Sequence, residues 1–246
     1  MKTFLLITVS LGLGLLACKK ESTDSSVTPT TTTLPDAFKK FNSTLSVAID
    51  GNYVVIKSTG IPDHKSPYFS TTSSQYEAYN GTNAKFSKNP NSISTQNLVF
   101  RIPLTPTKAA SPQATPLGPI GVSLNGVPFF NQYAGPSQPL TNEINSFDQY
   151  GGHPQQTGQY HYHVEPTYLT KAYGSSALLG FLLDGYPVYG PMENGKAVSN
   201  SDLDAYHGHS HATTEYPNGI YHYHITAQDP YINGNGFYGT PGSVSQ

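Results

Sequence analysis

Two short stretches of the chain alternate tyrosine and histidine in the same order. The first is Tyr160 to His163 in GQYHYHVEP, and the second is Tyr221 to His224 in GIYHYHITA. Side chains two residues apart in a strand point to the same side, about 6 to 7 Å apart along the chain. Each stretch therefore predicts a strand with histidines on one face and tyrosines on the other. Such an imidazole pair can bind one cation with bonds of about 2.0 to 2.1 Å.

Histidine pairs separated by one residue are more frequent than chance provides. With 9 histidines in 246 residues, about 0.3 such pairs are expected by counting matches. A third ligand is available to each motif, because His153 precedes the first and His209 precedes the second. Three imidazoles with one open position are typical of a catalytic or exchangeable site, whereas a fourth protein ligand would close it. The four pairs are His161/His163, His207/His209, His209/His211 and His222/His224.

These donors favour a transition-metal ion as cofactor. Imidazoles without thiolates suit zinc, copper or nickel better than calcium, magnesium or an iron–sulfur cluster, and we expect copper or zinc. The alternative is that the histidines are hydrogen-bonded structural residues. Whether the donors form one site or two is left open. The predicted ligands are His153, His161, His163, His209, His222 and His224, and further candidates, as extra ligands or as groups that orient a ligand ring, are His64, Asp148, Asp184, Asp204, His207 and His211.

Other chemistries lack a motif in this sequence. No serine lies in Gly-x-Ser-x-Gly, and neither a phosphate loop nor a dinucleotide fingerprint is present. Cys18 is the only cysteine, which excludes an internal disulfide and a thiolate metal site. A net charge of −2 without a basic block beyond the N-terminal segment excludes neither enzymes nor binding proteins, but argues against a nucleic-acid partner. Catalytic residues stay unknown.

The N-terminal residues have the pattern of an export signal. A basic start, Met1-Lys2, precedes an apolar run, Phe4 to Leu16, that is too short to span a bilayer stably. The run ends in LLAC, so we predict a lipoprotein signal peptide over 1–18 and lipidation of Cys18. A plain secretory peptide with an incidental cysteine is the alternative. We expect an exported protein, anchored to membrane lipid through Cys18 on the periplasmic or surface side of a bacterial cell envelope.

The two motifs belong to a longer internal repeat. IGVSLNGVPFF, Ile120 to Phe130, aligns with LGFLLDGYPVY, Leu179 to Tyr189, at an offset of 59 residues. FDQYGGH aligns with LDAYHGH at an offset of 56, and the two motifs align at an offset of 61. Two copies, about 118–165 and 177–226, favour a domain with a pseudo-two-fold axis, because a solenoid needs at least three repeats.

Short strands and frequent turns dominate the rest of the chain. Residues 19–36 are rich in serine and threonine and predict a flexible tether. Within 37–246, Asp50-Gly51 lies between two β-branched runs and predicts a hairpin, whereas only Pro166 to Gly180 can hold a helix. We predict an all-β fold, an antiparallel sandwich or barrel-like domain with few short helices.

Five blocks of the chain resemble the YHYH domain family of bacterial exported proteins and lipoproteins. The blocks are GIPDH, PLGPIGVSLNGVPFFNQY, GGHPQQTGQYHYH, LLGFLLDGYPVYGP and EYPNGIYHYHITAQDPY, which follow one another between Gly60 and Tyr238. The resemblance implies a domain type and a histidine-rich site but no particular reaction. Many relatives carry cysteines near the first histidine loop, and this chain has none there.

Two classes of function follow from these patterns. The first is an envelope lipoprotein that binds copper or zinc through histidines from both copies. It would store and deliver the metal, or act as a metalloenzyme that activates water or cycles copper beside the tyrosines. The alternative is a ligand- or glycan-binding β module, in which exposed tyrosines stack on a small molecule and the histidines are structural.

Overall fold

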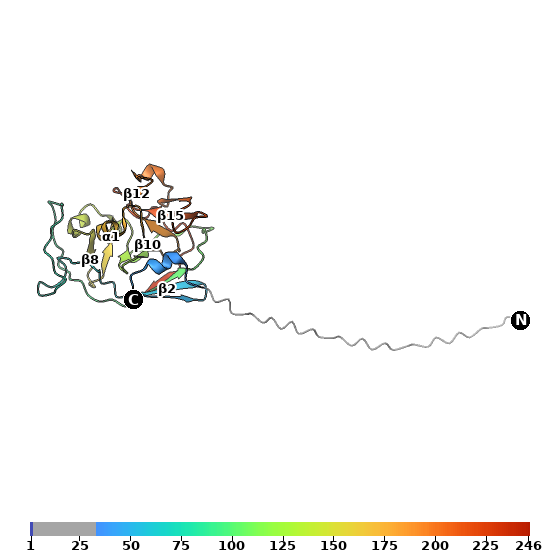
Figure 1. Cartoon of the computed structure of the whole chain (residues 1–246), viewed down its shortest axis with the longest axis horizontal. Coiled ribbons are helices and arrows are strands. Elements are labelled where there is room, and N and C mark those ends of the chain that lie inside the picture. The colour runs from blue at the N-terminus through green and yellow to red at the C-terminus, as the bar shows by residue number, and fades with distance from the viewer. Residues whose placement is uncertain (2–32) are drawn as a thin grey trace. The chain divides into compact units, whose positions relative to one another are not determined.

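The computed structural model describes Met1 and residues 33–246 (Figure 1). The predicted signal peptide, the lipidation site Cys18 and the tether as far as Thr32 lie outside the described residues and stay predictions. Within the part of the chain that the structure describes, no helix has the length and apolar character needed to cross a bilayer. Residues Thr33–Gln246 form one compact unit.

An eight-stranded sheet carries both tyrosine–histidine motifs. Its strand order is symmetric about the central pair β10 and β4, which run antiparallel with Phe181 opposite Val122. From one edge to the other, the strands are β14 (Gly208–His211), β15 (Ile220–His224), β11 (Pro187–Tyr189), β10 (Leu178–Leu182), β4 (Gly121–Ser123), β5 (Pro128–Phe129), β9 (Tyr160–Tyr162) and β8 (Gly152–Pro154).

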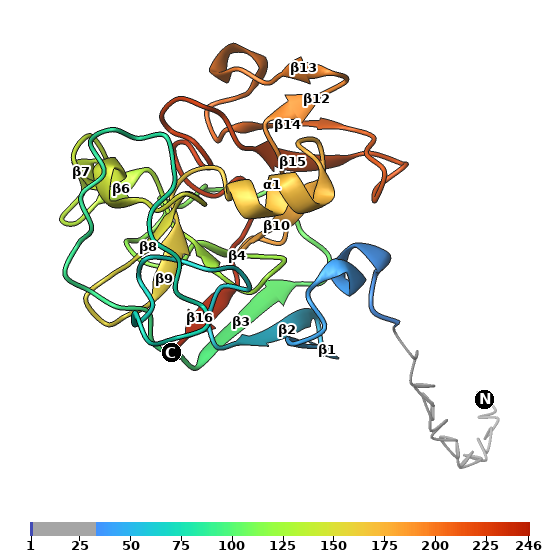
Figure 2. The same ribbon diagram turned by 60° about the vertical axis from the view of Figure 1, so that its left-hand side comes forward.

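This strand order confirms the internal duplication. Each copy contributes a hairpin near the centre of the sheet, β4–β5 or β10–β11, and an outer antiparallel pair, β8–β9 or β14–β15. The motifs therefore lie toward opposite edges of one sheet. Figure 2 shows β14 and β15 at one end and β8 and β9 at the other.

The sheet is mixed rather than wholly antiparallel. β5 pairs with β9 in parallel, and β11 pairs with β15 in parallel. A parallel pair needs a long crossover connection, and here the loop and outer strand between the two partners provide it. The predicted all-β class is confirmed, and the sheet closes into no barrel in the described residues.

A second sheet packs on the same core. It is antiparallel throughout, in the order β1 (Ser46–Asp50), β2 (Tyr53–Ser58), β3 (Leu98–Pro103) and β16 (Ser243–Ser245). Asp50 pairs with Tyr53 around Gly51, which has a φ of 58°, so the predicted hairpin is confirmed. Ile56 and Phe100 of this sheet share one hydrophobic core with Phe181 of the larger sheet, as in a sandwich.

Short elements complete the unit. α1 (Thr167–Tyr173) lies in the segment that the sequence allowed for a helix. The 3-10 helices are η1 (Asp36–Lys40), η2 (Glu143–Ser146) and η3 (Asn200–Asp202). Two ribbons occupy corresponding places in the copies, namely β6 (Tyr133–Ala134) with β7 (Gln138–Pro139) and β12 (Met192–Glu193) with β13 (Lys196–Ala197).

The tyrosines of the motifs face the core. Tyr160, Tyr162 and Tyr223 are fully buried, and Tyr221 is nearly so. Because residues alternate between the two faces of a strand, the histidines between them point to the opposite side of the sheet. Burial of one face of each motif strand thus fixes the direction of the imidazoles on the other.

Candidate metal centres

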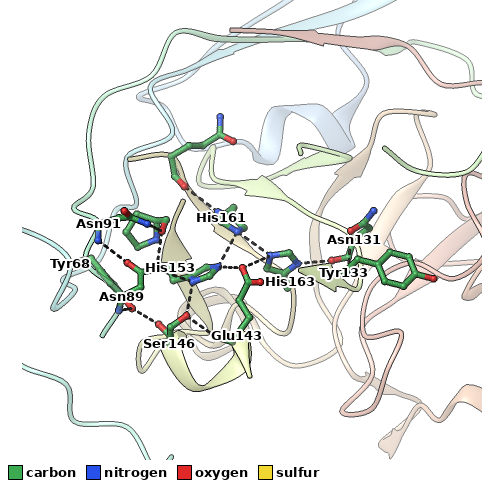
Figure 3. Close-up of polar contacts among 12 residues, drawn as sticks. Tyr68, Asn89, Asn91, Asn131, Tyr133, Glu143, Ser146, His153, His161 and His163 are labelled. Carbon is green, nitrogen blue, oxygen red and sulfur yellow. Dashed lines mark hydrogen bonds and ion pairs between the residues drawn. The ribbon is translucent and has the colours of Figure 1, made fainter. Parts of the chain in front are cut away.

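The first cluster of metal-binding side chains lies at the β8–β9 edge (Figure 3). His153 of β8 is paired directly with His161 of β9, and their Nε2 atoms are 3.1 Å apart. His163 follows β9, and its Nε2 lies 3.0 Å from that of His161. Glu143 of η2 brings its Oε1 to 3.1 Å from the Nε2 of His153. We call Glu143, His153, His161 and His163 the first centre.

The second cluster lies at the β14–β15 edge. His209 of β14 is paired with His222 of β15, as His153 is with His161. His211 brings its Nε2 to 3.0 Å from that of His209, and the Oε1 of Glu193 is 3.4 Å from the Nε2 atoms of both His209 and His224. The second centre therefore consists of Glu193, His209, His211, His222 and His224. Within each centre, one donor atom from every member lies within 4.8 Å of the others.

Backbone carbonyl groups fix the tautomers of most of these histidines. In the first centre, the Nδ1 of His161 lies 3.1 Å from the carbonyl oxygen of Gln159, and the Nδ1 of His163 contacts the carbonyl of Asn131. A carbonyl oxygen can only accept a hydrogen bond, so Nδ1 keeps the proton of a neutral ring. The Nε2 atoms then carry lone pairs, and these point into the centre.

The second centre repeats these contacts at equivalent positions. The Nδ1 atoms of His222 and His224 donate to the carbonyl groups of Ile220 and Gly190, each at 2.9 Å. Gly190 follows Asn131 by the repeat offset of 59 residues. The Nε2 atoms of His222 and His224 are buried and have no hydrogen-bond partner among the described residues. Such orphaned acceptors are costly unless a cation or a proton reaches them.

A side chain holds the remaining ring of the first centre. Ser146 donates its hydroxyl proton to the Glu143 carbonyl at 2.7 Å, so its oxygen is free to accept the Nδ1 proton of His153, also at 2.7 Å. The Nδ2 of Asn89 lies 3.2 Å from the same Nδ1 and donates to the Pro154 carbonyl at 3.0 Å. The Ser146 contact fits a His153 proton on Nδ1, whereas the Asn89 contact fits a proton on Nε2, where Glu143 is the neighbouring acceptor.

Burial disfavours the protonated form of the most deeply buried histidines of the centres. It lowers the pKa of His163 and of His222 to about 4, and it holds the pKa of His161 well below the ordinary value of 6.5. For Glu193, burial favours the neutral acid, but the neighbouring histidines outweigh it and lower the pKa. At neutral pH these buried imidazoles are neutral, and a carboxylate lies beside them in each centre, which is the protonation state that metal binding requires.

The distances between donor atoms fit a shared ion. Two nitrogen atoms bound to one ion at about 2.0 to 2.1 Å lie about 2.9 to 3.4 Å apart for bond angles from about 90° to about 109°. The Nε2 separations of 3.0 and 3.1 Å in the two centres fall in this range. The residues present therefore fit a transition-metal ion in each centre.

The predicted aspartates lie outside both centres, on the tyrosine side of the motif strands. Asp148 accepts hydrogen bonds from the hydroxyl groups of Tyr160, at 2.8 Å, and Ser66, at 2.6 Å. Asp204 accepts one from the hydroxyl group of Tyr221, at 2.9 Å. Asp184 accepts one from Tyr223 at 2.6 Å, and burial raises the pKa of Asp184 to about 6. These contacts hold tyrosines rather than ligand imidazoles.

Two predicted histidines also lie apart from the clusters. The Nε2 of His64 is 3.0 Å from the hydroxyl of Tyr162, and its ring is buried. His207 is buried too, and its Nε2 is 3.0 Å from the hydroxyl oxygen of Thr226. His207 has a φ of 77°, and its equivalent in the first copy is Gly151, with a φ of 84°. Of the additional candidates, the structure brings only His211 into a centre.

Sequence reasoning missed Glu143 and Glu193. They do not occupy equivalent positions, because Glu193 lies in β12 and Glu143 lies in η2, so the repeat alignment does not reveal them. One signal was available for the first copy. Glu143 is the only acidic residue between Phe130 and Asp148, in the segment that leads to His153.

The fold and the clusters define a duplicated β-sheet protein with a histidine–glutamate centre in each copy. Comparison with protein families then identifies the chain. The family model described as YHYH protein matches residues 99–200 and 192–236, which together cover more than half of the chain, so the protein belongs to the YHYH family. The resemblance found in the sequence is confirmed. No curated protein and no solved structure matches the chain.

Proposed function

We propose that the protein binds two transition-metal ions, one in each centre, with copper or zinc as the ion. The observation that carries this proposal is the buried pair of Nε2 atoms in His222 and His224, which point into the second centre with no hydrogen-bond partner among the described residues. Their Nδ1 atoms donate hydrogen bonds to backbone carbonyl groups, so the ring protons are not on Nε2. A cation that accepts both lone pairs satisfies these atoms without changing either ring.

A purely structural hydrogen-bond network explains the first centre less well. His161 has one Nε2, and this atom approaches both His153, at 3.1 Å, and His163, at 3.0 Å. With the ring protons of His161 and His163 held on Nδ1 by carbonyl groups, no proton remains between their Nε2 atoms, and facing lone pairs repel. One ion at the centre would bind the three Nε2 atoms and so remove the repulsion between their lone pairs.

The donor types select the metal class. The first centre offers three nitrogen atoms and one carboxylate oxygen, and the second offers four nitrogen atoms and one carboxylate oxygen. Nitrogen-rich sites without thiolates suit zinc and copper, whereas calcium and magnesium take oxygen ligands. A bound ion would supply Lewis acidity or, if it is copper, redox chemistry. The chain's own part is to fix the donors, keep them neutral and orient them.

We further propose where the protein works. Residues 1–18 act as a lipoprotein signal peptide, and lipidated Cys18 anchors the mature chain to membrane lipid on the exported side of a bacterial envelope. Support for this placement comes from the sequence alone. Detection of a lipid-modified N-terminal cysteine by mass spectrometry of the membrane fraction tests it, and a mature N-terminus at any other residue contradicts it.

Elemental analysis tests the metal proposal. Protein purified without an affinity tag is expected to contain copper or zinc, up to two ions per chain. The His161→Ala/His163→Ala double variant should contain less metal while it keeps the circular dichroism of a folded β protein. Metal-free protein that binds oligosaccharides would instead favour the alternative function, a glycan-binding module with structural histidines.

A further inference from the structure

The two centres differ at one pair of equivalent positions. His211 follows Gln155 by the repeat offset of 56 residues. His211 belongs to the second centre, whereas the side chain of Gln155 contacts Thr157 and Gln159 beside the first. The second centre therefore has five donor residues and the first has four.

The additional donor is also the most accessible one. The side chain of His211 is 39% exposed, whereas those of His163 and His222 are 2% and 0% exposed. Glu193, His222 and His224 lie behind it and still provide, with His209, three nitrogen atoms and one oxygen atom. Four donors are sufficient for a tetrahedral ion, so His211 is not needed to complete the coordination.

Each centre adjoins a pocket, and the aromatic residues that line the two pockets differ. A pocket of about 280 Å³ beside the second centre is lined by His211, His222 and His224. At its wall, Tyr189 meets His222 edge-on, with ring centroids 5.1 Å apart, and donates its hydroxyl proton to Glu215 at 2.8 Å.

The equivalent place beside the first centre has an apolar ring in place of the tyrosine. The residue equivalent to Tyr189 is Phe130, which stacks flat on His161 with ring centroids 3.9 Å apart. Together with Glu143, His161 and His163, this apolar ring lines a pocket of about 320 Å³ beside the first centre, and it covers one face of the His161 imidazole. Both centres therefore adjoin a pocket, and they differ in their most exposed donor, which is His211 at 39% in the second centre and Glu143 at 27% in the first.

We infer that the second centre exchanges its ion with the surroundings through His211, whereas the first centre retains its ion. This inference rests on the proposed function. His211 binds the ion as an inner donor leaves, and an incoming nitrogen or oxygen ligand then replaces His211 from the pocket. Each step forms one metal–ligand bond and breaks another, with no change in oxidation state. The partner is a molecule that carries such a donor, either a chelating small molecule or a metal-accepting protein.

Metal release from the full-length protein loaded with zinc tests the inference. Release to an excess of a chromophoric chelator, followed by absorbance, is expected to show a fast phase and a slow phase of one ion each. His211→Gln, which places the residue of the first copy at this position, should slow the fast phase by about tenfold or more, equivalent to about 1.4 kcal/mol of barrier. Gln155→His should accelerate the slow phase. His64→Gln, a buried histidine outside both centres, serves as the control and should change neither phase.

Three results would overturn the inference, namely a single phase for both ions in the wild type, faster release from His211→Gln, or loss of one ion from that variant. The last two would make His211 a ligand that holds the ion. A wild-type protein that binds no zinc or copper would instead overturn the proposed function itself, so the two failures are distinguishable.

Discussion

His153 and His161 lie directly opposite each other across β8 and β9, with their Nε2 atoms 3.1 Å apart. His209 and His222 form the equivalent pair across β14 and β15. The register of each antiparallel ladder, rather than the spacing within one strand alone, brings a third imidazole to each motif. Since the two ladders occupy opposite edges of the sheet, the copies form two centres and not one.

Separate centres should lose their ions separately. His161→Gln/His163→Gln removes two of four donors from the first centre and should reduce bound zinc from two ions to one. His222→Gln/His224→Gln should do the same for the second centre, and the quadruple variant should bind none. Elemental analysis after loading and dialysis measures this. Loss of both ions from either double variant would show that the histidines form a single pooled site.

Acid should destabilise the metal-stripped protein. The pKa values of His163 and His222 are lowered by burial to about 4, whereas unfolded histidine titrates near 6.5. Between these values the unfolded chain binds protons that the folded chain does not, so the free energy of unfolding falls as pH decreases from 6.5 to 4. Each ring contributes up to about 3 kcal/mol.

Thermal denaturation of the stripped protein across pH 7.5 to 4 measures this loss. The His163→Gln/His222→Gln variant should show a flatter dependence over the same range. A wild-type melting temperature that stays constant from pH 6.5 to 4 would mean that these rings take up protons in the folded state as readily as in the unfolded chain.

The aspartates beside the tyrosines should affect stability and not metal content. Asp148→Ala leaves the hydroxyl groups of Tyr160 and Ser66 without their buried acceptor, and we expect a loss of about 2–4 kcal/mol. Asp204→Ala is the matched control, because Asp204 is exposed and accepts from Tyr221 beside solvent, and it should cost about 1 kcal/mol or less. Chemical denaturation and elemental analysis test both points. A missing ion in Asp148→Ala would make Asp148 part of a centre.

Asp184→Asn should stabilise the protein at pH 7. The pKa of Asp184 is raised by burial from 3.8 to about 6, so the folded state holds a proton that the unfolded state has lost between these values. Stability falls as pH rises through this window, and the cost is fully present above pH 6. The equivalent residue, Asn125, shows that an amide fits this position and contacts the hydroxyl of Tyr162.

We expect a gain of about 1 kcal/mol at pH 7 that disappears near pH 4. Denaturation of both proteins at the two pH values provides the comparison. Equal stability at pH 7 would indicate that the hydrogen bonds of Asp184 from Tyr223 and Gly239 already compensate for its charge.

The sequence was sufficient for features that depend on local periodicity. Alternation in Tyr160 to His163 predicted a strand with two chemically different faces, and the structure has buried tyrosines on one of them. The Asp50-Gly51 hairpin and the internal repeat were also predictable, because turn residues and recurring blocks can be recognised directly in the sequence. All of these features involve residues that are near neighbours or direct copies.

Features that depend on long-range pairing were not predictable. The parallel pairing of β5 with β9 follows from a crossover whose path no short segment specifies. Glu143 and Glu193 reach the centres from different elements, so duplication gave no sign of them. Asp148 follows Phe147 in a loop where no fixed period sets side-chain direction, and it turns to Tyr160 rather than to a histidine.

Anomalous X-ray scattering from crystals of the protein, measured at the absorption edges of zinc and copper, would locate bound ions in the two centres. Two peaks per chain are expected, one among Glu143, His153, His161 and His163, and one among Glu193, His209, His222 and His224. Absence of a peak in both places, in crystals grown from protein supplied with both metals, would contradict the proposed metal binding.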